Sequence, residues 1–290
     1  MDKNQITRRV MKILVILKGC VIVRYVVLFL SVNFLAMPIY LVGVLHDDPG
    51  GYACTKSALK KFQPSMVGVE WAGDEYERFR ESDEVVRLQA EMDEAIRRVF
   101  CELGLDQSLY DEGNTISNER SFGEVRAVRD YSSEEGLVVV ATESAESRIA
   151  MDRNFLSDVD GACRWYRNWL TSLIESREGY NPEAINVFDP WEYDAFEAHL
   201  NGDMSQENAK KWLENGYIPG AINEPRVSHQ VRQVREAVRR LGENDVFVHV
   251  GGLAHLIDDG LAETRGPINL WQHLVSQFRD RVSRHSLRTV

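Results

Sequence analysis

The sequence predicts an α/β fold in which a parallel or mixed sheet is built from βαβ units. Short runs rich in Val and Ile at 39–45, 65–71 and 137–142 are typical of buried strands, and 245–255 is a fourth strand that ends in a glycine turn and a histidine. Longer helical stretches separate these runs. Strand–helix–strand order pairs neighbouring strands in parallel, which is the basis of the fold prediction.

The segments between the strands carry apolar residues at spacings of three and four, which predicts amphipathic helices. These helices are expected at 55–62, 75–102, 123–136, 224–242 and 269–285. Residues 109–123 are polar and are expected to be irregular. The aromatic and helical stretch at about 157–220 is expected to be an insertion, with ordinary core packing as the first explanation of its aromatic side chains.

We expect residues 37–290 to form a single domain, preceded by a hydrophobic extension at 1–36. The longest uncharged run of this extension, 25–36, is shorter than the roughly 20 residues that span a bilayer. Three interpretations are open: a signal or anchor, a true N-terminal helix, or an upstream extension with the natural start at Met37. We favour Met37 because a strand follows it at once. A membrane location or export is expected only if 1–36 is a genuine anchor or signal.

Composition excludes some classes of partner. The chain has 290 residues with 34 basic and 45 acidic side chains, a net charge of -11 that repels phosphate backbones, so no nucleic-acid partner is expected. The four cysteines lack Cys-x-x-Cys spacing, which indicates reduced thiols and favours a cytoplasmic location. Composition leaves the oligomeric state open.

Ionisable side chains follow three of the predicted strands. Two Gly-x-x-His motifs, at 43–46 and 252–255, place His46 and His255 after the first and fourth strands, and Glu70 ends the second. Loops at the carboxyl ends of parallel strands converge on one crevice. Two imidazoles and a carboxylate suit Zn, Mn, Co or Fe, and such an ion acidifies water for hydrolysis. The spacing therefore predicts a divalent metal site.

Simpler interpretations of each residue are also open. A lone histidine at a strand end is more often structural, Glu70 fits a helix cap, and Asp47 and Asp48 fit a cap or turn before a helix. His249 lies inside its strand and is expected to be a packed residue. The motifs His-Glu-x-x-His, Gly-x-Ser-x-Gly, Gly-x-Gly-x-x-Gly and the P-loop do not occur, so other common enzyme classes lack their central element.

The order of these motifs resembles the TraB/PrgY, GumN and Tiki group. The segments "YLVGVLH", "QPSMVGVE" and "VFVHVGGLAH" are similar to the family's opening Gly-x-x-His, its Pro-x-x-Val-x-Val-Glu strand and its closing Gly-x-x-His. "FGEVRAV" matches the family's Gly-Glu helix at Glu124, and "NEPRVSH" supplies an arginine at Arg226. Arg153 is a weaker match. The resemblance covers roughly 38–259, with 157–220 poorly matched.

The resemblance implies a metal-dependent hydrolase, similar to metalloproteases in the Tiki branch, that cleaves a peptide or ester-like bond in a peptide or small-molecule substrate. It implies Glu124 as a further ligand or general base and Arg226 as a group that steadies a substrate carboxylate or oxyanion. The alternative is a non-catalytic binding or regulatory protein that holds a peptide or haem in the same crevice, since haem-binding ChaN-like proteins are related in fold. Many TraB homologues carry C-terminal membrane helices, a pattern that this sequence does not show.

Overall fold

The computed structural model describes residues 37–46, 48–120, 122–175, 191–205, 207–209, 224–258, 260–262 and 267–290. It confirms the α/β prediction. The described strands form one five-stranded sheet, all parallel, in the order β3-β2-β4-β1-β5. Its strands are β1 (Ile39–Val44), β2 (Met66–Val69), β3 (Val138–Ala141), β4 (Phe247–Gly252) and β5 (Val282–Ser286).

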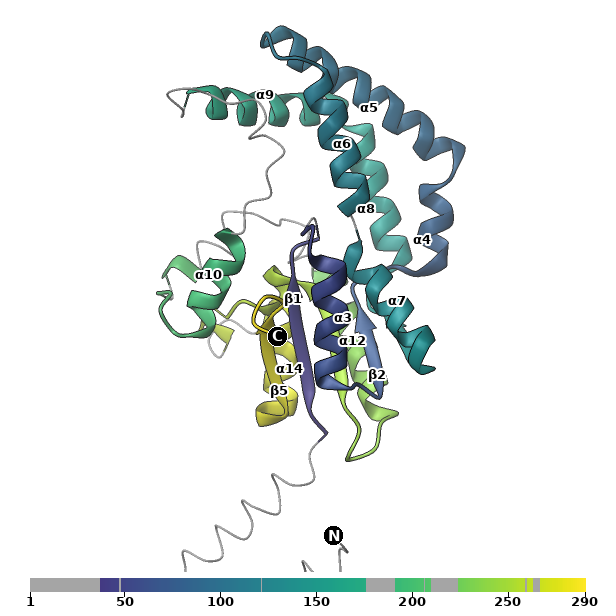
Figure 1. Ribbon diagram of the computed structural model, residues 1–290, viewed down its shortest axis with the longest axis vertical. Coiled ribbons are helices and arrows are strands. Elements are labelled where there is room, and N and C mark those ends of the chain that lie inside the picture. The colour runs from purple at the N-terminus through teal and green to yellow at the C-terminus, as the bar shows by residue number, and fades with distance from the viewer. Residues whose placement is uncertain are drawn as a thin grey trace, which may run out of the picture.

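Helices cover both faces of this sheet (Figure 1). On one face α3 (Gly51–Phe62) packs against α7 (Gly123–Glu135), and on the other α12 (Glu224–Arg239) packs against α14 (Leu270–Phe278). The strands between these layers are almost wholly apolar and buried, as expected of a parallel sheet that is covered twice. Ile39, Val67 and Phe247 are completely buried at its centre.

A second group of helices lies beyond the carboxyl ends of the strands (Figure 1). We call this group the helical cap. It has an apolar core of its own, in which Phe100, Tyr110 and Leu170 are buried together. The cap consists of α4 (Gly73–Arg80), α5 (Asp83–Glu102), α6 (Ser108–Arg120), α8 (Ala145–Ser157) and α9 (Val159–Glu175).

Three elements differ from the sequence prediction. The helix expected at 75–102 is two helices, because Ser82 begins α5 by accepting a hydrogen bond from the backbone N–H of Val85. The segment expected to be irregular, 109–123, contains α6, whose Tyr110 is anchored in the cap core. The last helix ends at Phe278, where Arg279 turns the backbone with a φ of 49°. Residues 282–286 then form β5 beside β1.

The described parts of the expected insertion at 157–220 include α9 and α10 (Trp191–Leu200). Its remaining segments, and the whole extension 1–36, lie outside the described residues. Within the part of the chain that the structure describes, no helix has both the length and the apolar character that crossing a membrane requires.

Candidate functional site

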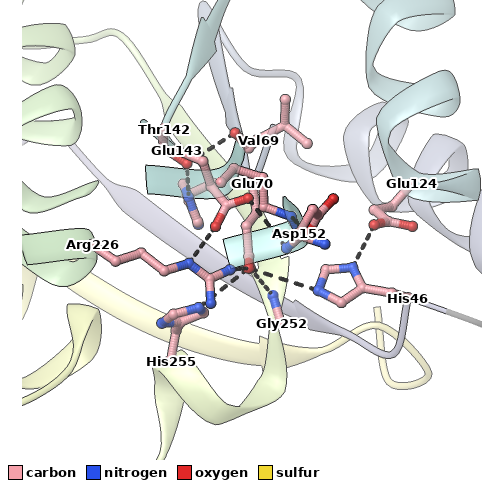
Figure 2. A network of polar contacts seen from close by, with 12 residues as sticks. His46, Val69, Glu70, Glu124, Thr142, Glu143, Asp152, Arg226, Gly252 and His255 are labelled. Atoms are coloured by element: carbon pink, nitrogen blue, oxygen red, sulfur yellow. Dashed lines mark hydrogen bonds and ion pairs between the residues drawn. The ribbon is translucent and has the colours of Figure 1, made fainter. Parts of the chain in front are cut away.

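The strands that carry the predicted site residues are neighbours in the sheet. His46 follows β1, Glu70 follows β2, and His255 lies in the short 3-10 helix η2 (Leu253–Leu256) after β4. Because β4 pairs with both β1 and β2 in parallel, all three residues lie at the same edge of the sheet, beneath the helical cap. The predicted convergence is therefore present, and Figure 2 shows the side chains pointing toward one another.

Glu70 is the centre of the cluster. Its Oε1 lies 3.3 Å from Nε2 of His255 and 3.8 Å from Nε2 of His46, while its Oε2 accepts a hydrogen bond of 2.6 Å from the backbone N–H of Gly252. A side chain at position 252 would put its Cβ 3.2 Å from His46 Nε2, so Gly252, the glycine of the second Gly-x-x-His motif, leaves room for the His46 imidazole. Glu70 and His255 are buried, whereas the His46 side chain is 47% exposed.

Arg226 joins Glu70 to a second buried carboxylate. Its Nη2 donates to Glu70 Oε1 and its Nε donates to Glu143 Oε1, so one guanidinium bridges two glutamates (Figure 2). Arg226 lies in the first turn of α12, next to Pro225, which suits the start of a helix. Glu143 also lies 3.7 Å from the guanidinium of Arg148 on α8. The cluster thus continues toward the cap.

His46 has a second carboxylate partner on its other side. Its Nδ1 lies 2.6 Å from Oε1 of Glu124, which is 1% exposed in the first turn of α7. Gly123 allows α7 to start this close to α3, because a Cβ at that position would lie 3.2 Å from the backbone nitrogen of Tyr52. The imidazole is therefore oriented by Glu124, with its Nε2 directed toward Glu70.

The charges of the cluster shift two pKa values in opposite senses. Burial alone would raise the pKa of Glu70, but the positive charges of His255 and Arg226 hold it well below its usual value. For His46, whose side chain is half exposed, the loss of water around the ring acts to lower the pKa, but the hydrogen bond to Glu124 and the negative charge of Glu70 outweigh it and raise the pKa to about 9. Glu70 is thus a carboxylate at neutral pH.

The donor set suits a divalent metal in its chemistry. Two ligand atoms of one tetrahedral ion lie roughly 3.4 Å apart if each is about 2.1 Å from the metal. The spacing of 3.3 Å between Glu70 Oε1 and His255 Nε2 agrees with this value, and the 3.8 Å to His46 Nε2 is slightly longer. Arg226, however, donates to the same oxygen, and among the described residues no three His, Cys, Asp or Glu side chains are arranged as a metal-binding group.

Two other described residues singled out in the sequence lie elsewhere. Arg153 is exposed on α8, where its guanidinium binds both carboxylate oxygens of Glu84 at 2.7 and 3.1 Å. Asp48 accepts a hydrogen bond of 2.7 Å from the backbone N–H of Gly50 in the turn before α3, while Asp47 lies outside the described residues. These contacts give Arg153 and Asp48 local partners of their own.

His249 is fully buried within β4. Its Nε2 lies 3.0 Å from the hydroxyl of Thr142, and burial lowers its pKa to about 4, so the ring is neutral. Its Nδ1 has no hydrogen-bond partner among the described residues, and the same holds for Nδ1 of His255.

Two charged residues of the cluster, Glu143 and Arg148, were not predicted from the sequence. Glu143 follows the third strand as Glu70 follows the second, so the rule that led to Glu70 would also have found it. Arg148 carried no such signal, because it lies inside α8 and faces Glu143 only through the packing of that helix beside the strand end.

Fold and site together define a parallel α/β protein with a histidine–carboxylate–arginine cluster at the carboxyl edge of its sheet. No protein-family model, no curated protein and no solved structure gives a significant match to this chain. The resemblance to the TraB and Tiki group therefore stays a prediction from the sequence motifs.

Proposed function

We propose that the protein is a metal-dependent hydrolase of the TraB and Tiki type, in which His46, Glu70 and His255 hold a divalent metal ion. The substrate is a peptide or a small molecule with an ester-like bond. The observation that carries the proposal is the approach of two imidazole nitrogens, at 3.3 and 3.8 Å, to one buried carboxylate oxygen.

The carboxylates on both sides of His46 support this assignment. With its pKa raised to about 9, the metal-free ring is protonated at neutral pH, so Nδ1 faces Glu124 and a protonated Nε2 faces the negatively charged Glu70. A divalent cation between His46 and Glu70 would take the place of the Nε2 proton and leave Nε2 as a ligand. A hydrogen-bonded carboxylate on the far side of a ligating imidazole is also the usual arrangement around protein-bound metals.

A bound divalent ion would supply an acidified water and polarise the scissile carbonyl. Each neighbouring residue would have its own role beside such an ion. Glu124 orients the His46 ring through Nδ1, and the half-exposed His46 marks the side from which substrate enters. Arg226 offers positive charge for an oxyanion, and Glu143 holds its guanidinium in place.

The test is the metal content of the purified protein. Wild type, His46→Ala and His255→Ala are dialysed against Mn²⁺, Co²⁺, Zn²⁺ or Fe²⁺ and then measured by mass spectrometry, with Arg153→Ala as the control. We expect close to one equivalent in wild type and the control, and a loss of at least about tenfold in affinity for the two histidine variants. Unchanged metal content in both would refute the proposal.

A metal-free hydrolase is the second candidate, favoured by the short contact between His46 and Glu124. A buried carboxylate that orients an imidazole is the arrangement of a general base, which here would remove a proton from water through Nε2 once the pH approaches the raised pKa of His46. Activity on a panel of esters and peptides that survives dialysis against a chelator would identify this mechanism. Bound metal without turnover on the panel would instead indicate a binding protein.

A further inference from the structure

The helical cap contains a cavity of about 780 Å³ that is separate from the strand ends but shares residues with their surroundings. Cavities of this size hold drug-sized ligands. Its walls come from α4, α5, α6 and α8 and from the residue before α7. The apolar side chains of the lining include Phe79, Val86, Phe122, Met151, Phe155 and Leu156.

The charged groups of the lining already have partners. Asp152 accepts from the hydroxyl of Tyr76 and lies 3.2 Å from Nε of Arg148, which also faces Glu143. Asp93 accepts from the hydroxyl of Tyr110 at 2.8 Å. A charged ligand would be buried here without a partner, at a cost in free energy, or would break one of these pairs. A neutral ligand leaves the pairs intact.

The remaining charged residue of the lining, Arg80, lies over an aromatic ring. Its guanidinium is 5.1 Å from the centre of the Phe122 ring. The cavity thus presents paired charges and open apolar surface, which favours an uncharged apolar ligand.

Two apolar side chains of the lining are unusually exposed. Val86 is 62% and Phe155 is 60% exposed, although both are large hydrophobic residues on helices that have buried faces. An apolar group in the cavity would cover surface that now faces water, and this burial favours binding.

The cavity adjoins the candidate site at two places, one linked by a contact and one by the chain. Arg148 belongs to the lining and faces Glu143, which holds Arg226 against Glu70. Phe122 also belongs to the lining and stands two residues before Glu124, the partner of His46. Figure 2 includes Asp152, the cavity residue at the end of this chain of polar contacts.

We propose that the cap cavity binds the uncharged apolar portion of the substrate, such as an acyl chain of medium length, while the bond to be cleaved lies at the strand ends. The substrate is then an ester or amide with a bulky apolar group on one side. This inference rests on the proposed function for the reaction, but the binding of an apolar group is measurable without turnover.

The binding test uses N-phenyl-1-naphthylamine, an uncharged apolar dye whose fluorescence rises in apolar surroundings, with the full chain. Ala90 lines the cavity and is exposed, so Ala90→Trp fills the space without displacing core residues. Ala150→Trp is the matched control, on an exposed position of α8 outside the lining. We expect saturable binding by wild type and control, and an affinity lower by about tenfold or more in Ala90→Trp.

The same three proteins are assayed with p-nitrophenyl acetate and p-nitrophenyl octanoate. Wild type and Ala150→Trp are expected to prefer the octanoate in kcat/KM, and Ala90→Trp is expected to lose this preference. If Ala90→Trp does not fold, as judged by circular dichroism, Phe155→Ser replaces it, since Phe155 lines the same cavity.

Equal dye affinity in Ala90→Trp and wild type would overturn the cavity assignment, as would an octanoate preference that survives the substitution. Loss of dye binding in Ala90→Trp with no ester or peptide turned over by wild type would support the apolar site and refute the hydrolase. The two proposals therefore fail separately.

Discussion

Replacement of Arg226 by methionine removes the only guanidinium that bonds both Glu70 and Glu143 among the described residues. Both carboxylates are buried, with 3% and 5% of their side-chain surface exposed, and the arginine side chain is 10% exposed. Methionine keeps most of the apolar stem of arginine, so the perturbation is mainly one of charge. Two buried carboxylates then lose their shared cation.

The expected cost follows from that burial. Breaking a buried ion pair by removing one partner destabilises a protein by about 3–5 kcal/mol, because the remaining charge is left without compensation. The histidines near Glu70 offset part of the loss, while among the described residues the cation that stays within 4 Å of Glu143 is Arg148, at 3.7 Å. For a chain of this size, 3–5 kcal/mol corresponds to a Tm lower by roughly 6–20 °C.

Urea and thermal unfolding followed by circular dichroism measure this difference. Arg153→Met is the matched control, because it deletes the same group from an exposed pair with Glu84 and should cost about 0–1 kcal/mol. If the free energy of unfolding falls no further in Arg226→Met than in the control, the cluster is not a buried charge network as described.

The pH dependence checks the sign of the same argument. In wild type the pKa of Glu70 lies below its unfolded value, so its stabilising contribution is present at neutral pH and disappears as the pH falls through the folded pKa. In Arg226→Met that depression is reduced. The gap in stability between the two proteins should therefore narrow from pH 7 toward pH 4, and a constant gap would contradict this explanation.

Two further predictions concern His46 and its neighbour. The pKa of His46 is raised to about 9, so its contribution to stability is complete below the unfolded pKa near 6.5 and is lost as the pH rises toward 9. The free energy of unfolding, measured with urea, should therefore fall over this pH range in wild type but not in His46→Gln. An equal fall in the variant would assign it to another group. Gly252→Ala should displace His46, lowering kcat/KM on any substrate found by about tenfold or more while unfolding changes by at most about 1 kcal/mol. Gly51→Ala, where a Cβ makes ordinary contact, is the control, and equal activities in the two variants would contradict the prediction.

The strand pattern predicted much of the fold and the meeting of three site residues. Buried parallel strands are continuous apolar runs, and 39–44, 66–69 and 247–252 stand out for this reason. The strand at 282–286 does not stand out, because Arg284 and His285 interrupt it and it lies at the sheet edge. An edge strand has one neighbour and tolerates polar side chains, so the sequence around it also fitted a helix.

The polar surroundings of the site were harder to predict. Glu124 and Arg226 were placed by a family resemblance, and their roles depend on where α7 and α12 begin. Arg148 reaches Glu143 only because α8 packs beside the third strand end, which is a tertiary contact without a local signal. Sequence spacing locates strand ends well, but the partner of a side chain on a packed helix depends on the helix position.

Glu70 Oε1 is the point at which two cations compete. Arg226 donates to this oxygen, and the two histidine nitrogens face it, so a metal ion bound there must replace the guanidinium contact. Arg226→Met should therefore bind a divalent metal more tightly than wild type, although it is less stable without one. A metal present at 100 times its Kd adds about 2.7 kcal/mol to folding stability, so saturating Zn²⁺ or Mn²⁺ should recover much of the loss in this variant. If the metal raises the folding stability of Arg226→Met by no more than that of Arg153→Met, then the arginine, and not a metal ion, is the natural partner of Glu70.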